Sequence, residues 1–182
     1  MKIVKLLITA SLTFLFVANI CAQTKPPSAW EVVKGAQSEA LKAHKNVFII
    51  FHASWCVWCR KMDTAMNDKS IKSFFDKNYV IRHLSVDESP GKKNLENPGA
   101  TELREKYKGD HQGIPYWFII NADGKLLADS RLHSEDGQLT GNNVGCPATP
   151  VEVGYFVRVI KKTSELNDTQ LASIRERFSK NN

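Results

Sequence analysis

The chain has 182 residues, of which 42% are hydrophobic and 24% are charged, and its formal net charge is +6. This average composition predicts a soluble globular protein with one ordinary core, and the chain contains no low-complexity tract. No block of Lys or Arg marks a basic surface, so a nucleic-acid partner is not expected.

The first 22 residues predict a signal peptide. Lys2 and Lys5 precede an apolar run at 6–20, which is too short for a comfortable membrane span. Cleavage after Ala22 would remove both lysines and lower the formal charge to +4. The alternative is lipidation at Cys21, which the bulky residue before it disfavours. Residues 23–182 are then expected to form a single domain in the periplasm or outside the cell.

The next part of the chain predicts a helix, a buried strand and further helices. Ser28 and Glu31 have the spacing of a capping box for a helix that ends near His44. Its apolar positions recur at helical spacing and are Trp30, Val33, Ala36, Ala40 and Leu41. Residues 47–51 are β-branched or aromatic and predict a fully buried strand, followed by helices at 60–66 and 70–75 and a strand at 79–86.

The second half predicts a loop at 87–99, a helix at 100–107, and strands at 116–120 and 125–131 joined by a hairpin turn at 121–124. A long loop at 132–149 precedes a helix at 150–163 and an extra C-terminal helix at about 167–179. Strand–helix–strand units that end in a hairpin imply an α/β fold, with a central mixed sheet flanked by helices.

The motif Trp55-Cys56-Val57-Trp58-Cys59 lies at the junction between the predicted buried strand and the helix that follows it. At a helix N-terminus, unpaired N–H groups and the helix dipole stabilise a thiolate. Cys56 is therefore the candidate nucleophile for a substrate disulfide, and Cys59, on the same helix face, is the candidate resolving thiol. A zinc site is disfavoured because it needs a second pair of ligands.

The chain resembles the thioredoxin superfamily, and it is most similar to exported bacterial members. The resemblance covers about 29–163 and rests on residues 51–62 around the two cysteines, on Val86-Asp87, and on Gly113-Ile114-Pro115. It implies a thioredoxin-like fold and a cis Pro115 that faces the cysteines. It also implies that Ile114 and Pro115 hold the substrate peptide.

The sequence departs from the cytosolic thioredoxin pattern at two positions. Ile50 replaces a buried Asp six residues before the first cysteine, and His83 stands where that pattern has a Lys. Either His83 tunes Cys59 or it makes an ordinary hydrogen bond, and the second interpretation is favoured. Val57-Trp58 replaces the usual Gly-Pro between the cysteines, so the resemblance does not define the reduction potential.

Cys146 leaves an odd number of cysteines after residue 22, and its loop should return beside Pro115. It is a candidate third redox thiol, although a small buried residue is the favoured interpretation. Trp55 and Trp58 are expected to form an exposed apolar surface for substrates, and Val57 between the cysteines is a further candidate substrate contact. Trp30 and Trp117 are assigned to the core.

The resemblance implies an exported thiol–disulfide oxidoreductase that acts on protein substrates and exchanges electrons with a membrane-bound redox partner. No metal or organic cofactor is implied, and a monomer is expected. The alternative is a binding or chaperone-like module that has the fold but is redox-inactive.

Overall fold

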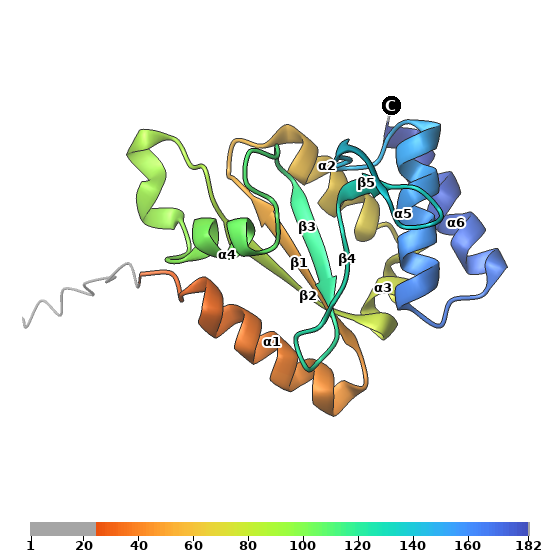
Figure 1. Cartoon of the computed structure of the whole chain (residues 1–182), viewed down its shortest axis with the longest axis horizontal. Coiled ribbons are helices and arrows are strands. Elements are labelled where there is room, and N and C mark those ends of the chain that lie inside the picture. Colours follow the sequence, from red (N-terminus) through yellow and green to blue (C-terminus); the bar gives the residue numbers. More distant parts are fainter. Residues whose placement is uncertain (1–24, 182) are drawn as a thin grey trace, which may run out of the picture.

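The computed structural model describes residues 25–181, so the predicted signal peptide and Cys21 lie outside the described residues. The sheet at its centre has four strands in the order β2-β1-β3-β4 (Figure 1). They are β1 (Asn46–His52), β2 (Tyr79–Ser85), β3 (Tyr116–Ile120) and β4 (Leu126–Asp129). Strand β1 is parallel to β2 and antiparallel to β3, and β4 is antiparallel to β3. The predicted mixed sheet is thereby confirmed.

Helices cover both faces of this sheet. One face carries α1 (Ala29–Ala43) and α4 (Ala100–Lys106). The other carries α2 (Val57–Met66), α3 (Lys72–Asn78), α5 (Pro150–Thr163) and α6 (Asp168–Phe178). The predicted loop at 87–99 contains a short 3-10 helix, η1 (Pro90–Leu95), and a second one, η2 (Ser179–Asn181), follows α6.

Strand β1 is buried on both faces, which explains its continuous apolar sequence. Phe48 and Ile50 point to the core under α2, α5 and α6, whereas Val47, Ile49 and Phe51 point to the core under α1. Side chains alternate along a strand, so a strand between two helical layers needs apolar residues at every position.

Helix α1 begins with the predicted capping box, but two of its apolar residues are not buried. Trp30 is 46% exposed and Leu41 is 63% exposed, so their assignment to the buried face was wrong. The buried stripe is narrower and consists of Ala29, Val33, Ala36 and Ala40. Trp30 directly follows the buried Ala29 in the sequence, so the turn of the helix carries its side chain away from this stripe. The Lys106 ammonium lies 4.9 Å from the centre of the Trp30 ring.

The predicted loop at 132–149 was wrong over part of its length. It contains a second, two-stranded sheet formed by β5 (Arg131–His133) and β6 (Leu139–Asn143). Gly137, at a positive φ of 85°, belongs to the turn that joins these strands, as an Asp-Gly sequence favours. The predicted strand at 125–131 therefore ends at Asp129, and Arg131 belongs to the second sheet.

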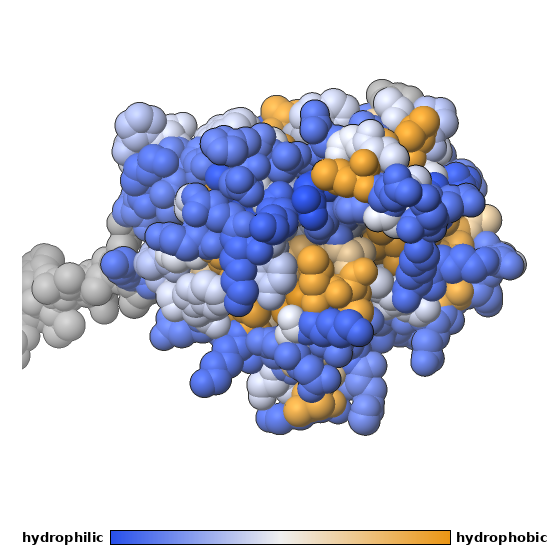
Figure 2. Space-filling model, in the orientation of Figure 1, coloured by the Kyte–Doolittle hydropathy of each residue, from blue (hydrophilic) through white to orange (hydrophobic). Residues whose placement is uncertain are grey.

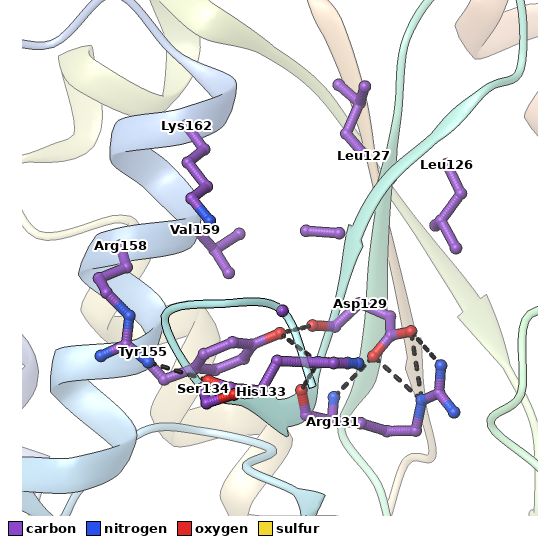
Figure 3. Close-up of a pocket in the computed structure, with 12 residues that line it drawn as sticks. Leu126, Leu127, Asp129, Arg131, His133, Ser134, Tyr155, Arg158, Val159 and Lys162 are labelled. Atoms are coloured by element: carbon purple, nitrogen blue, oxygen red, sulfur yellow. Dashed lines mark hydrogen bonds and ion pairs between the residues drawn. The ribbon is translucent and has the colours of Figure 1, made fainter. Parts of the chain in front are cut away.

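A buried polar cluster fastens the end of β4 to α5 (Figure 3). The Asp129 carboxylate is buried and forms an ion pair with the Arg131 guanidinium at 2.6 Å. The Tyr155 hydroxyl donates a 2.6 Å hydrogen bond to the Asp129 carbonyl, and burial raises the pKa of that hydroxyl. Beside this cluster lies a cavity of about 320 Å³, which neither member of the Cys56–Cys59 pair lines. The exposed Leu126 and Leu127 of β4 line this cavity, and a hydrophobic patch covers the surface over β4 (Figure 2).

Candidate active site

Cys56 is the N-cap residue of α2, directly after the loop that leaves β1. Its backbone N–H donates to the Ala53 carbonyl at 3.0 Å, and the N–H of Cys59 donates to the Cys56 Sγ at 3.1 Å. The two cysteines are joined by a disulfide. When that disulfide is reduced, a Cys56 thiolate would accept from the same N–H and would lie at the positive end of the helix dipole.

The disulfide is almost enclosed, whereas the side chains beside it are exposed. Cys56 is 3% exposed and Cys59 is 2% exposed, and both pack against Ala53 and Ile114. Around them the large apolar side chains of Trp55, Val57 and Trp58 are 45–56% exposed. The predicted exposure of these tryptophans is confirmed, and Trp117 lies in the core as predicted.

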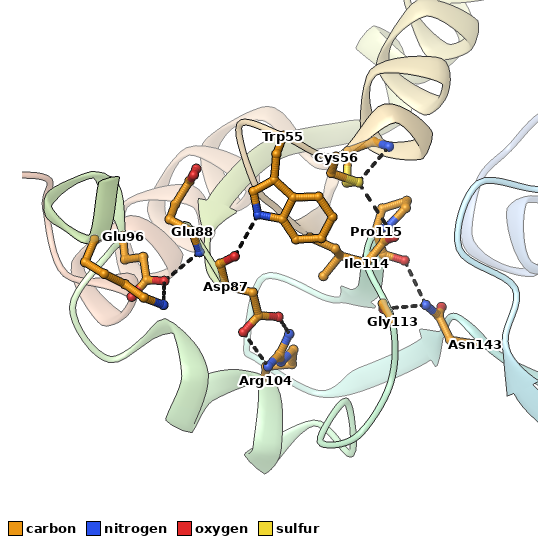
Figure 4. A network of polar contacts seen from close by, with 12 residues as sticks. Trp55, Cys56, Asp87, Glu88, Glu96, Arg104, Gly113, Ile114, Pro115 and Asn143 are labelled. Carbon is orange, nitrogen blue, oxygen red and sulfur yellow. Dashed lines mark hydrogen bonds and ion pairs between the residues drawn. A yellow bond between two sulfur atoms is a disulfide. The ribbon is translucent and has the colours of Figure 1, made fainter. Parts of the chain in front are cut away.

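The peptide bond between Ile114 and Pro115 is cis, as the resemblance implies. The Ile114 carbonyl oxygen lies 3.7 Å from the Cys56 Sγ, which places this bond directly against the disulfide. The Asn143 side-chain amide donates to the carbonyls of Gly113 at 2.6 Å and Pro115 at 2.9 Å (Figure 4). Asn143 therefore supports the cis bond from β6, and the sequence analysis did not identify it.

A cavity of about 530 Å³ lies along the cis bond, between Trp58 and the segment that contains Cys146. Trp58, Ile114 and Pro115 line one part of it, and residues 142–146 line another. The predicted approach of the Cys146 loop to Pro115 is therefore confirmed.

Cys146 itself does not meet the requirements of a reactive thiol. It is 5% exposed, and burial raises the pKa of its thiol to about 12. The Asn181 side-chain amide donates to its Sγ at 3.3 Å. Since the thiolate is the nucleophile, these surroundings favour the structural interpretation of Cys146.

The loop before Cys56 is held by a carboxylate that the sequence analysis missed. Glu88 is 4% exposed, and its two oxygens accept from the Ser54 backbone N–H at 2.6 Å and from the Ser54 hydroxyl at 2.7 Å. The Glu88 N–H in turn donates to Glu96 at 2.8 Å (Figure 4). Glu88 thus joins the segment after β2 to the segment that positions Cys56.

A second series of polar contacts holds Trp55 in its exposed position. Its indole N–H donates to the Asp87 carbonyl at 2.8 Å, and Asp87, at a positive φ of 53°, pairs through its carboxylate with the buried Arg104 at 2.5 Å (Figure 4). A ring anchored in this way can present an apolar surface without folding back onto the core.

The two departures from the thioredoxin pattern are adjacent in the sheet, where Ile50 pairs with His83. Ile50 is buried in the core, and the His83 Nε2 is 2.7 Å from the Asp63 carboxylate, which is the ordinary hydrogen bond that the favoured interpretation predicts. The His83 ring is 5.0 Å from that of His52. Burial, and then the electrostatic interaction with His83, lower the pKa of His52.

Among residues 25–181 no group of three or more His, Cys, Asp or Glu side chains is arranged to hold a metal ion. Within the same part of the chain, no helix has the length and apolar character needed to cross a membrane.

Residues 29–122 match the model of a family described as thioredoxin-like, and the chain belongs to this family. This match covers the cysteine pair, the cis-proline and the sheet up to the hairpin turn after β3. No curated protein sequence matches the chain.

Several solved structures are similar. A disulphide isomerase from Xylella fastidiosa Temecula1 is 22% identical, with 84% of this chain and 89% of that chain covered and a TM-score of 0.48. A DsbH oxidoreductase is 24% identical, with 75% and 83% covered and a TM-score of 0.43. The oxidised C-terminal domain of Neisseria meningitidis DsbD is 22% identical, with 57% and 84% covered and a TM-score of 0.40.

Proposed function

We propose that this protein is an exported thiol–disulfide oxidoreductase that reduces or exchanges disulfides in protein substrates. One observation carries the proposal. The Cys56 sulfur is at the N-terminus of α2, bonded to the Cys59 sulfur, and 3.7 Å from the Ile114 carbonyl beside the cis-proline. A sulfur at this position can exchange disulfides with a peptide bound along the Ile114–Pro115 segment.

The proposed reaction needs no metal or organic cofactor. In the reduced protein, the Cys56 thiolate attacks one sulfur of a substrate disulfide and releases the other as a thiolate, which takes a proton from solvent. The Cys59 thiol loses its proton and attacks the Cys56 sulfur of the mixed disulfide. The second substrate sulfur then leaves as a thiolate. Two electrons pass to the substrate, and the Cys56–Cys59 disulfide forms.

The exposed side chains of Trp55, Val57 and Trp58 support protein substrates rather than small thiols. They form an apolar surface next to the disulfide, and such surfaces on soluble proteins mark interaction sites. Export to the periplasm or beyond is supported by the pattern of residues 1–22. A cysteine pair outside the cytoplasm must be returned to its starting redox state after each reaction, so the proposal includes a membrane-bound redox partner.

Trapping of mixed disulfides tests the proposal. A Cys59→Ala variant should accumulate disulfides between Cys56 and substrate proteins, because the resolving thiol is missing. A Cys56→Ala/Cys59→Ala variant is the matched control and should trap none. If Cys59→Ala traps no more than this control, the redox-inactive binding module is favoured instead.

The reduction potential of the Cys56–Cys59 couple decides the direction of the reaction. Equilibration with glutathione should give a value of about −270 mV for a reducing protein or about −120 mV for a disulfide-forming oxidant. A pair that does not equilibrate with glutathione at all would contradict the proposed function.

A further inference from the structure

A groove of about 380 Å³ lies beside the active-site helix, between α2 and the C-terminal segment formed by α6 and η2. Among residues 25–181, every titratable side chain that lines it is a cation, and none is a carboxylate. The cations, which together we call the basic groove, are Arg60, Lys61, Arg177 and Lys180. Val57, directly after Cys56 and exposed, lines the same groove.

The charge of the basic groove is only partly neutralised. Arg60 donates to the Ser54 carbonyl at 3.0 Å, and Lys61 donates to the Asn181 carbonyl at 3.0 Å. Both acceptors are neutral, so these bonds orient the two cations and leave their charge uncompensated. The Lys61 ammonium also lies 4.2 Å from the centre of the Trp58 ring, so the positive charge continues to the exposed apolar surface.

The other two cations are paired at the periphery. Arg177 forms a 2.8 Å ion pair with Asp68, and Lys180 forms a 2.8 Å ion pair with Glu176. The Arg177 side chain is largely buried, whereas both members of the Lys180–Glu176 pair are exposed. An exposed pair is weak and exchanges readily with a competing anion. A carboxylate in the groove therefore meets two uncompensated cations and a third, Lys180, that is held only by a surface pair.

Asn181 fixes the C-terminal segment to the active site. It is 6% exposed, and its side-chain amide donates to the Pro147 carbonyl at 3.1 Å and to the Cys146 Sγ at 3.3 Å. Its side-chain oxygen accepts from Arg177 at 3.1 Å, while its carbonyl accepts from Lys61. The groove is thus a fixed part of the active-site surface, built from a segment beyond the family-matched residues 29–122.

We infer that the basic groove binds an acidic, extended segment of the protein whose disulfide reacts with Cys56. The inference rests on the proposed function and names the chemistry of its substrate. Charge complementarity selects the occupant, since a groove to which the described part of the chain contributes four cationic side chains attracts an anionic segment and repels a basic one. The position of Val57 lets the same polypeptide reach Cys56.

The test uses two peptides with one disulfide each, identical except that two Asp residues near the disulfide in the first are Asn in the second. The rate at which each oxidises the reduced, full-length protein is measured by acid quench and alkylation of thiols. At an ionic strength of about 0.01 M, where the Debye length is about 30 Å, the acidic peptide should react roughly tenfold faster. At about 1 M salt, where the Debye length is about 3 Å, this preference should disappear.

Matched charge reversals locate the effect. Lys180→Glu should lower the acidic-to-neutral rate ratio roughly fivefold, because it reverses a charge in the groove. Lys180→Arg should keep the ratio of the unmodified protein. Lys42→Glu, on the exposed side of α1 and on the opposite face of the sheet, changes the net charge equally and should keep that ratio as well. A change in the reactivity of Cys56 alters the rates of both peptides equally, so it cancels in the acidic-to-neutral rate ratio.

Each contrary outcome has a separate meaning. Equal rates for the two peptides in the unmodified protein refute the basic groove and leave the oxidoreductase proposal standing. A preference that Lys180→Glu does not reduce refutes the groove. A preference that Lys42→Glu reduces as much as Lys180→Glu does is an effect of net charge, and it also refutes the groove. If neither peptide oxidises the Cys56–Cys59 pair, the proposed function fails, and the inference fails with it.

Discussion

Removal of the Glu88 carboxylate should loosen the segment that positions Cys56. The carboxylate is 4% exposed and accepts two short hydrogen bonds from Ser54, at 2.6 and 2.7 Å. Hydrogen bonds to a charged group contribute about 1.5–3 kcal/mol each. Ser54 is exposed, so water replaces part of each bond and the lower end of that range applies. Glu88→Ala should therefore lower the free energy of unfolding by about 3 kcal/mol.

Glu88→Gln is the informative companion variant. Its amide can still accept from the Ser54 N–H and donate to the Ser54 oxygen, so two neutral bonds of about 1 kcal/mol each replace the charged ones. We expect a loss of about 1 kcal/mol, clearly smaller than that of the alanine variant. The assay is urea unfolding of the oxidised protein, with the midpoint and slope fitted for each variant.

A double-mutant cycle assigns the loss to the contact itself. Ser54→Ala removes the hydroxyl bond to Glu88 and keeps the backbone N–H bond, and in that background Glu88→Ala should cost about 1.5 kcal/mol less than it does alone. Additive effects of the two changes, or a cost of Glu88→Ala below about 0.5 kcal/mol, would refute the reasoning. The reduction potential of the variants shows in addition whether the loosened loop changes the relative stability of disulfide and dithiol.

Three further outcomes are expected. Cys146→Ser should leave the reduction potential unchanged, and the native Cys146 should resist alkylation until the protein unfolds, because its pKa is raised to about 12 by burial; rapid alkylation in the folded state contradicts this. Phe178→Ala should cost about 3–5 kcal/mol in urea unfolding, because the ring is fully buried, whereas Leu41→Ala should cost less than about 0.5 kcal/mol; similar costs would show that α6 is not part of the core. Because the pKa of His52 is lowered in the folded protein, the unfolded chain takes up a proton on His52 at a higher pH than the folded chain does. The free energy of unfolding should therefore fall as the pH drops below about 6.5, and His52→Gln should flatten this dependence.

Local patterns predicted most of the elements correctly. The capping box at Ser28, the five apolar residues of β3 and the helix from Pro150 each lie where the sequence placed them, because caps, burial and the absence of helix breakers act over a few residues. The β5–β6 hairpin was missed because its strands are mostly polar and half-exposed, so neither has the apolar alternation of a strand on a core.

Residues that act through distant contacts were not predictable. Glu88 and Asn143 are ordinary loop and strand residues in the sequence, and no motif marks them. They become part of the site because they contact Ser54 and the Gly113 and Pro115 carbonyls, 34, 30 and 28 positions away. Trp30 was misplaced for the opposite reason, since its hydrophobicity indicated burial while the helix phase turned it to the surface.

The sequence by itself determined the fold class and the position of the cysteine pair. A buried strand that leads into a helix through Cys56 and Cys59 places both cysteines at a helix N-terminus, because this geometry is local. The tertiary structure decided how the site is supported and what surrounds it. Whether Cys146 is buried, whether Asn181 reaches α2, and whether four cations line one groove all depend on packing between segments far apart in the chain, and no short-range pattern contains that information.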